Sequence, residues 1–170
     1  NIGDVIYGKD KTGSGSPDTI GINNPAPLVA LDVTYENILT LGLDTGGGEV
    51  VKFGTAGADY AAGFLVQLRG ASNWVKADAD DTTLQGNLLG IALGAAPSNG
   101  ILLKGYYKIH TADDVTTWTA GNQLYVSTVD GKITESLTSH GAGDYIRVVG
   151  HSTTTDNVMY FNPSPDFITI

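Results

Sequence analysis

Three aspartates lie close together near the middle of the chain, at Asp78, Asp80 and Asp81. Oxygen-rich loops of this kind hold calcium in many proteins, because Ca²⁺ takes carboxylate and carbonyl oxygens in a flexible coordination shell. The segment departs from the EF-hand pattern, since it lacks that loop's turn glycine and closing glutamate. Two interpretations stay open: a calcium site formed by these aspartates, and a solvated loop whose charges keep a strand end soluble. A melting temperature that a chelator leaves unchanged would favour the solvated loop.

The three histidines, His110, His140 and His151, are the other side chains with obvious chemical capacity. A nucleophilic triad needs a serine or cysteine activated by a histidine that a carboxylate orients. The sequence contains no cysteine and no Gly-x-Ser-x-Gly elbow, and the histidines occur in no recognisable motif. We interpret them as strand-end and loop residues, and we predict no catalytic residue, no enzymatic activity and no cofactor other than the calcium considered above. Hydrolysis by a carboxylate pair stays open, because sequence spacing does not give spatial spacing.

The composition argues against two classes of partner. The 170 residues carry 9 Lys+Arg against 18 Asp+Glu, which gives a net charge of −9 and a pI near 4.4. Such a chain offers little positive charge for a phosphate backbone or an anionic membrane surface. No apolar run approaches the length that crosses a bilayer. We therefore expect neither a nucleic-acid partner nor a membrane partner.

The elements that must position these residues are predicted to be short β-strands. Polar and apolar residues alternate through most of the sequence, which is the period of a half-buried strand. Exposed helices are disfavoured, because glycine is abundant, with 23 residues, and glutamate and glutamine are scarce, with three each. The predicted strands cover 4–7, 29–33, 38–43, 49–53, 64–68, 74–77, 88–93, 101–110, 124–127, 145–150, 158–161 and 167–170. We predict an all-β fold, a sandwich or barrel of short antiparallel strands with an N-terminal β extension.

The strand at 101–110 has the clearest alternation. Its two expected faces are Ile101, Leu103, Tyr107 and Ile109 toward the core, and Lys104, Tyr106, Lys108 and His110 mostly toward solvent. Asp130-Gly131 predicts a tight hairpin, because both residues tolerate positive φ, and a second hairpin is expected at 69–73. Gly46-Gly47-Gly48 is interpreted as a turn that leads into the strand at 49–53.

One change in composition divides the chain. Residues 1–57 are richer in Gly, Ser, Asp and Asn, whereas residues 58–170 form a denser succession of apolar strands. We predict an N-terminal β segment over 1–57, either shaft-like or strand-donating, and a compact β module over 58–170. An N-terminal segment of this size would bury little surface alone, so it is expected to pack on the module or on other subunits.

Two stretches carry a resemblance to known proteins. Residues 20–33, IGINNPAPLVALDV, are similar to a shaft element of bacteriophage tail fibres and of some large bacterial surface proteins, with Asn23 where a glycine usually stands. Several segments between Leu88 and Pro163 resemble, in order, a β module of phage virion structural proteins that recurs in tail fibres and head decorations. Those segments are LLGIALG, GILLKG, NQLYVST, GKIT, GDYIRVVG and NVMYFNP.

The resemblance implies a non-enzymatic, usually oligomeric building block of a virion or another extracellular assembly. The expected partners are copies of the chain itself, as a trimer or an open polymer, and a host-surface glycan or protein. One alternative is a subunit of a bacterial or archaeal extracellular filament or surface layer, and a second is a glycan-binding or glycan-active tail protein. The first residue, Asn1, is consistent with a processed terminus or an internal cut.

Strand sharing is the assembly mode that the sequence suggests. Short strands leave sheet edges, which proteins cover, close or share with a neighbour. The run Ile2–Tyr7, followed by a Gly/Ser-rich loop, has the form of a strand that is lent to the next subunit. Pairing of this run within its own module is the equal alternative.

Overall fold

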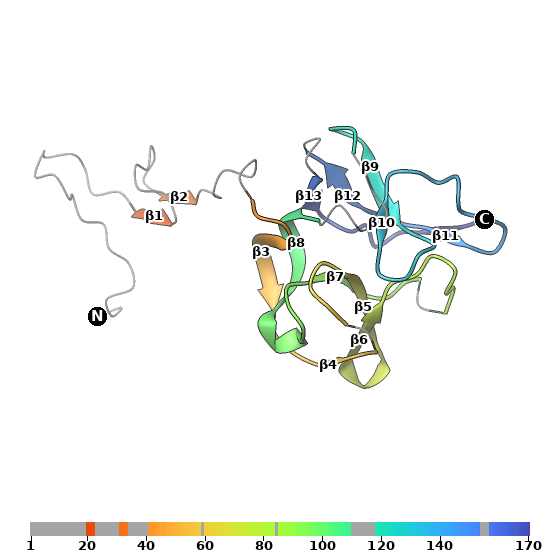
Figure 1. Cartoon of the computed structure of the whole chain (residues 1–170), viewed down its shortest axis with the longest axis horizontal. Helices are drawn as coiled ribbons and strands as arrows, with labels where there is room; N and C mark the ends of the chain where they lie inside the picture. The colour runs from red at the N-terminus through yellow and green to blue at the C-terminus, as the bar shows by residue number, and fades with distance from the viewer. Residues whose placement is uncertain are drawn as a thin grey trace, which may run out of the picture. The chain divides into compact units, whose positions relative to one another are not determined.

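The computed structural model describes residues 20–22, 31–33, 41–58, 60–83, 85–109, 118–153 and 157–170 (Figure 1). The chain divides into two compact units, Asn1–Thr40 and Leu41–Ile170. In the first unit, β1 (Ile20–Ile22) pairs in parallel with β2 (Leu31–Val33), with Ile20 opposite Leu31 and Ile22 opposite Val33. The two ends of the shaft-like element therefore lie side by side as strands. The predicted strand Ile2–Tyr7 and His110 lie outside the described residues.

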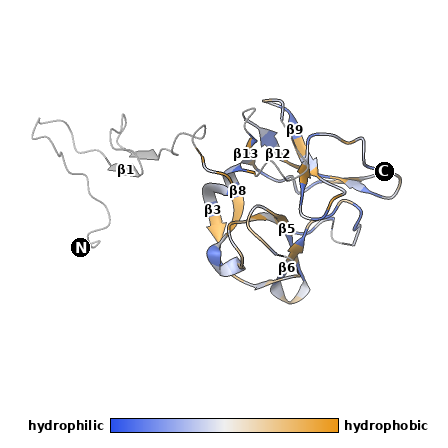
Figure 2. Cartoon of the chain, viewed as in Figure 1, coloured by the Kyte–Doolittle hydropathy of each residue, from blue (hydrophilic) through white to orange (hydrophobic). Residues whose placement is uncertain are grey.

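The second unit is an all-β module, as the sequence predicts. Its strands are β3 (Thr45–Val51), β4 (Thr55–Ala56), β5 (Leu65–Arg69), β6 (Asn73–Lys76), β7 (Leu89–Ala92), β8 (Ile101–Lys108), β9 (Gln123–Val126), β10 (Ile133–Thr134), β11 (Tyr145–Ile146), β12 (Val148–Ser152), β13 (Val158–Phe161) and β14 (Ile168–Thr169). The helical elements described are two single turns, η2 (Gly70–Ser72) and η3 (Pro97–Asn99). Hydrophobic and hydrophilic residues are interleaved along the strands (Figure 2). Within the described residues no helix is long and apolar enough to cross a membrane.

Ten of these strands form one sheet around β8. The strand order is β10-β9-β12-β13-β8-β7-β5-β6-β4, and β3 pairs with β8 off this path. Along β8, residues Ile101 and Leu102 pair with β7 while residues 105–108 pair with β13. Because β3 pairs with the whole of β8, from Ile101 to Lys108, it occupies the other side of that strand. The sheet therefore branches at β8, and β3 forms an edge of it.

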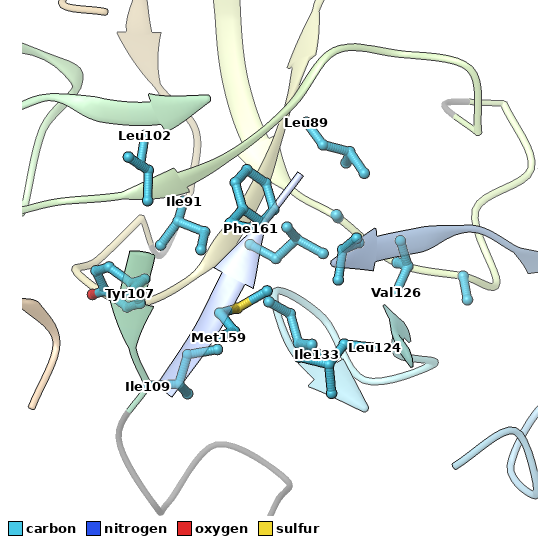
Figure 3. Close-up of a cluster of buried hydrophobic side chains, with 14 of the residues drawn as sticks. Leu89, Ile91, Leu102, Tyr107, Ile109, Leu124, Val126, Ile133, Met159 and Phe161 are labelled. Atoms are coloured by element: carbon cyan, nitrogen blue, oxygen red, sulfur yellow. The ribbon is translucent and has the colours of Figure 1, made fainter. Parts of the chain in front are cut away.

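The main core lies inside the curled sheet. Inward side chains from β5, such as Leu65, join those from β10, such as Ile133, in the same buried cluster. Figure 3 shows these side chains converging from β7, β8, β13, β9 and β10. The turn between β9 and β10 also bonds to the β5–β6 side of the sheet, since Leu65 N–H donates to the Gly131 carbonyl and Gly131 N–H donates to the Ala77 carbonyl, at 2.8 and 2.7 Å. The module is thus barrel-like, with the β9–β10 hairpin turn placed against the segment after β6.

The predicted faces of β8 are wrong over the first half of the strand, because a β-bulge interrupts the alternation of its side chains there. Leu102 packs in the main core with Tyr107 and Ile109, whereas Ile101 and Leu103 pack on a second cluster around Trp74. The register shift lies opposite Glu49 and Val50 of β3, so that one extra residue of β8 changes the alternation. The predicted outward placement of Lys104, Tyr106 and Lys108 agrees with their exposed or half-buried state.

Both predicted hairpins are confirmed, and the predicted glycine turn is wrong. β9 pairs with β10 around Gly131, which has φ +73°, and β5 pairs with β6 around Gly70–Ser72. Gly46, Gly47 and Gly48 instead lie inside β3, because their backbones pair directly with residues 105–107 of β8.

The division between the compact units also differs from the predicted boundary near Gly57. It falls between Thr40 and Leu41, because β3 and β4 are strands of the module's own sheet. Residues 41–57 therefore belong to the module.

Candidate functional site

The loop after β6 holds the three aspartates of the predicted calcium site. Ala77 and Ala79 are buried, and the Ala79 backbone bonds to Ser127 and to Tyr145, so the intervening Asp78 turns outward. The Asp78 Oδ1 atom accepts the Asp80 N–H at 2.9 Å. The Asp81 Oδ1 atom accepts the Thr83 N–H at 3.0 Å and the Thr83 hydroxyl at 2.6 Å. These bonds form two successive turns, in each of which an aspartate side chain accepts the N–H of the residue two positions later.

An open pocket of about 250 Å³ lies beside this loop. Asp78 and Asp81 line it, and Asp80 does not. The other lining residues are Ala58, Arg69, Val75, Lys76 and Asp130. The structure therefore brings together two of the three predicted aspartates and adds Asp130, whose place before Gly131 in the sequence indicates only a turn. Arg69 and Lys76 make the lining mixed in charge.

Asp78 and Asp130 interact across the pocket. Burial raises the pKa of Asp78 to about 6. The hydrogen bond from the Asp80 N–H opposes this rise, while a hydrogen bond to Asp130 and the negative charges of Asp80 and Asp130 add to it. Asp78 therefore keeps its proton up to about pH 6, a higher pH than an ordinary aspartate does.

The described residues do not contain a group of three or more His, Asp or Glu side chains arranged to hold a metal ion. The Asp78 carboxyl is engaged by the Asp80 N–H and by Asp130, and the Asp81 carboxyl by Thr83. The calcium hypothesis for Asp78, Asp80 and Asp81 remains a prediction.

The two described histidines lie in different surroundings. The His140 Nε2 atom is 3.0 Å from the Val126 carbonyl oxygen, and its Nδ1 atom is buried without a partner in the described part of the chain. His151 is exposed on β12. The His140 ring therefore contacts backbone rather than a carboxylate.

A buried arginine ties the C-terminal segment to the module. Arg147 is 5% exposed and donates to three carbonyl oxygens, those of Ser164 at 2.7 Å, Gln85 at 2.9 Å and Asn87 at 2.6 Å. Burial lowers the pKa of its guanidinium, which the nearby Tyr145 partly opposes. Beyond Ser164 the chain continues into β14, which pairs with β11. Arg147 thus holds the C-terminal segment and the segment before β7 together through three backbone carbonyls.

The sheet has an open edge at β3. Within the described residues β3 pairs only with β8, so the backbone on its other side faces no strand of the module. At seven residues it is longer than the two-residue strands β4 and β10 that end the main path. Figure 1 shows β3, in orange, at the margin of the module beside β8. An edge of this length presents unpaired N–H and C=O groups as a template for another strand.

Exposed apolar side chains lie within β3 or two residues beyond its ends along the chain. Leu43, Val50 and Phe53 are 49, 37 and 42% exposed, and they are three of the eight large apolar side chains exposed among the described residues. Phe167, Ile168 and Ile170 form a second exposed apolar group at β14. Exposed apolar surface beside an open strand edge is typical of protein interfaces.

Comparisons with protein-family models, with curated proteins and with solved structures find no match for this chain.

Proposed function

We propose that this protein is a non-enzymatic structural subunit of a virion or another extracellular assembly, such as a phage tail fibre, spike or head decoration. In this proposal its copies join when a strand of one subunit pairs with the β3 edge of the next. The open seven-residue edge of β3 is the observation that carries the proposal.

The chemistry of β3 supports a strand as its occupant. Soluble proteins usually protect long edges with lysine, proline, bulges or a covering segment. The first four residues of β3, Thr45 to Gly48, include no charged side chain and no proline, and three of them are glycine. A partner strand therefore has direct access to the backbone, and Leu43, Val50 and Phe53 supply apolar contacts beside it.

The test replaces Gly47 at the middle of this edge. A Cβ atom at Gly47 would meet nothing within 4 Å, so a side chain is accommodated in the single subunit. Gly47→Lys places a charge where the partner strand must approach, and Gly47→Ala is the matched control. Mass in solution should give a trimer or a larger species for the wild type and for Gly47→Ala, and a shift of at least tenfold toward single subunits for Gly47→Lys.

A wild-type protein that keeps the mass of one subunit at high concentration would contradict the proposal. Electron microscopy distinguishes the two kinds of assembly. Protein on the tail or head of a particle supports the virion role, and free helical threads support the bacterial or archaeal filament.

A further inference from the structure

The strand β14 and the residues around it bury no side chain in their own subunit. All six residues from 165 to 170 are exposed, and because successive side chains of a strand alternate, both faces of the strand are open. An antiparallel strand usually packs one face on a core. Ile168 is 66% exposed, Ile170 47% and Phe167 37%. Residues 167–170, Phe-Ile-Thr-Ile, favour strands, so an apolar strand surface stands ready for a partner.

One edge of β14 is bonded to the module. The strand pairs with β11, and the Ile170 N–H donates to the Asp144 carbonyl at 3.0 Å. Ahead of the strand, the Ser164 carbonyl accepts a hydrogen bond from buried Arg147 at 2.7 Å. In the part of the chain that the structure describes, β11 is the only strand that pairs with β14. The strand is therefore already ordered, and a partner at its other edge need not pay to order it.

The β3 edge and β14 complement each other in shape and polarity. Six of the eight large apolar side chains exposed among the described residues lie in these two strands or within two residues of them. In β3, a Cβ at Gly47 would meet nothing within 4 Å, so the glycine stretch leaves room for the bulky side chains of a neighbouring strand. Cross-strand neighbours lie about 5 Å apart, which brings the β14 isoleucines into contact with this space and with Val50.

The charges beside the two strands favour an antiparallel arrangement. Asp166 lies just before β14 and Lys52 directly follows β3, and both are exposed. When these two residues face each other in an antiparallel pair, Ile168 lies opposite Val50 on the same face. A parallel pair with the same ion contact would carry β14 past the end of β3. An exposed ion pair adds little affinity, so it selects the direction and the backbone and apolar contacts hold the copies together.

The two strands lie on different sides of the module. Figure 1 shows β11, to which β14 is bonded, across the module from β3. Because each strand is paired within its own subunit, β14 and β3 can meet only between two copies. A contact between two different surfaces is head-to-tail, and its repetition gives a ring or an open filament rather than a closed pair.

We propose that β14 of one copy pairs, in the antiparallel direction, with the β3 edge of the next copy. This inference rests on the proposed function, which does not specify the strand that fills the β3 edge. Pairing of two β3 edges, and filling of the edge by the run Ile2–Tyr7, are the alternatives that the test separates.

The test uses two variants that each block one of the two surfaces. Gly47→Lys blocks the β3 edge and keeps β14, whereas Ile168→Lys places a charge on β14 and keeps the β3 edge. Val129→Lys, the same kind of change at a position that is 48% exposed and outside both strands, is the matched control. Mass in solution is measured for each variant alone and for an equimolar mixture of the two blocked variants, and melting temperatures check that each variant folds.

Each blocked variant alone should shift at least tenfold toward single subunits, while Val129→Lys assembles like the wild type. The mixture should form a complex of two copies and grow no further. Its one intact combination is β14 of Gly47→Lys with the β3 edge of Ile168→Lys, so the two blocked surfaces remain at the ends of the complex.

Assembly of a folded Ile168→Lys like the wild type would overturn this inference and leave the proposed function standing, since another strand would then fill the β3 edge. A mixture that stays as single subunits would overturn it as well. A wild type that stays a single subunit contradicts the proposed function and this inference together.

A cysteine pair tests the same contact without a charged variant. The chain has no cysteine of its own, so Val50→Cys on one copy and Ile168→Cys on another, with one variant isotopically labelled, report only the designed contact. Oxidation of the mixture should link unlike copies. Absence of that link in assembled protein would overturn the antiparallel pairing of β14 with β3, including where Ile168→Lys does not fold.

Discussion

The ionisation of Asp78 affects the stability of the module. Its pKa rises from 3.8 to about 6 on folding, chiefly through burial, so the folded state holds the proton more tightly than the unfolded state. This proton contributes its full stabilisation of the folded state below about pH 4. The free energy of unfolding then falls as the pH rises from about 4 through 6. Asp78→Asn keeps the oxygen that accepts the Asp80 N–H and removes the charge. We expect this variant to be more stable than the wild type at pH 7. We also expect its stability to change less than that of the wild type between pH 4 and 6.

The size of this effect is limited by solvent. Because Asp78 is only partly buried, screening reduces the gain to about 1 kcal/mol, which raises the melting temperature by roughly 3 to 5 °C. Thermal melts at several pH values measure it. Asp166→Asn, which removes one negative charge from an exposed position, controls for net charge. A melting temperature of Asp78→Asn at or below that of the wild type at pH 7 would contradict the role of burial and of Asp130.

At this scale the sequence identifies the residues but not their neighbours. The run around Asp78, Asp80 and Asp81 is visible as a cluster, whereas Asp130 lies about fifty residues away and carries only the signal of a turn. The two meet because the turn at Gly131 bonds to Leu65 and Ala77. That closure is a property of the curled sheet, and no spacing in the sequence encodes it.

At the scale of the element, β3 depends on close backbone approach to β8. A Cβ at Gly48, which has φ +152°, would fall on the Lys104 carbonyl oxygen, and a Cβ at Gly46 would fall on the Tyr106 carbonyl oxygen. Gly46→Ala and Gly48→Ala are each expected to destabilise the module by about 2 to 3 kcal/mol. Gly47→Ala has open space and should change stability by less than about 0.5 kcal/mol.

Denaturant unfolding of the three alanine variants measures this difference. The three variants carry the same substitution at adjacent positions of one strand, so the change in strand propensity is the same in each. Differences in stability between them therefore report the space around each position. Equal stability of Gly47→Ala and Gly48→Ala would show that β3 does not pack on β8 in this register.

The same strand shows why the sequence predicts some elements well and others poorly. Period-two alternation requires side chains, so 101–110 is recognised as a strand, while the glycines of β3 carry no pattern and look like a turn. The sequence does not reveal the bulge at Leu103 either, because an extra apolar residue in an apolar run does not interrupt the pattern of the run. The boundary predicted near Gly57 differs for this reason, since β3 was the strand that tied residues 41–57 to the module.

At the scale of the whole molecule, net charge opposes assembly of the copies, whereas backbone pairing favours it. Each copy carries a charge of −9, so copies repel one another at low ionic strength. Salt at about 1 M shortens the screening length to about 3 Å, which removes this repulsion and also weakens exposed ion pairs worth about 0 to 1 kcal/mol each. Strand pairing at β3 relies on main-chain hydrogen bonds, so we expect the assembly to persist at high salt and to form at a lower protein concentration. Sedimentation across a salt series measures this, and dissociation as salt rises would show that ion pairs, rather than strands, join the copies.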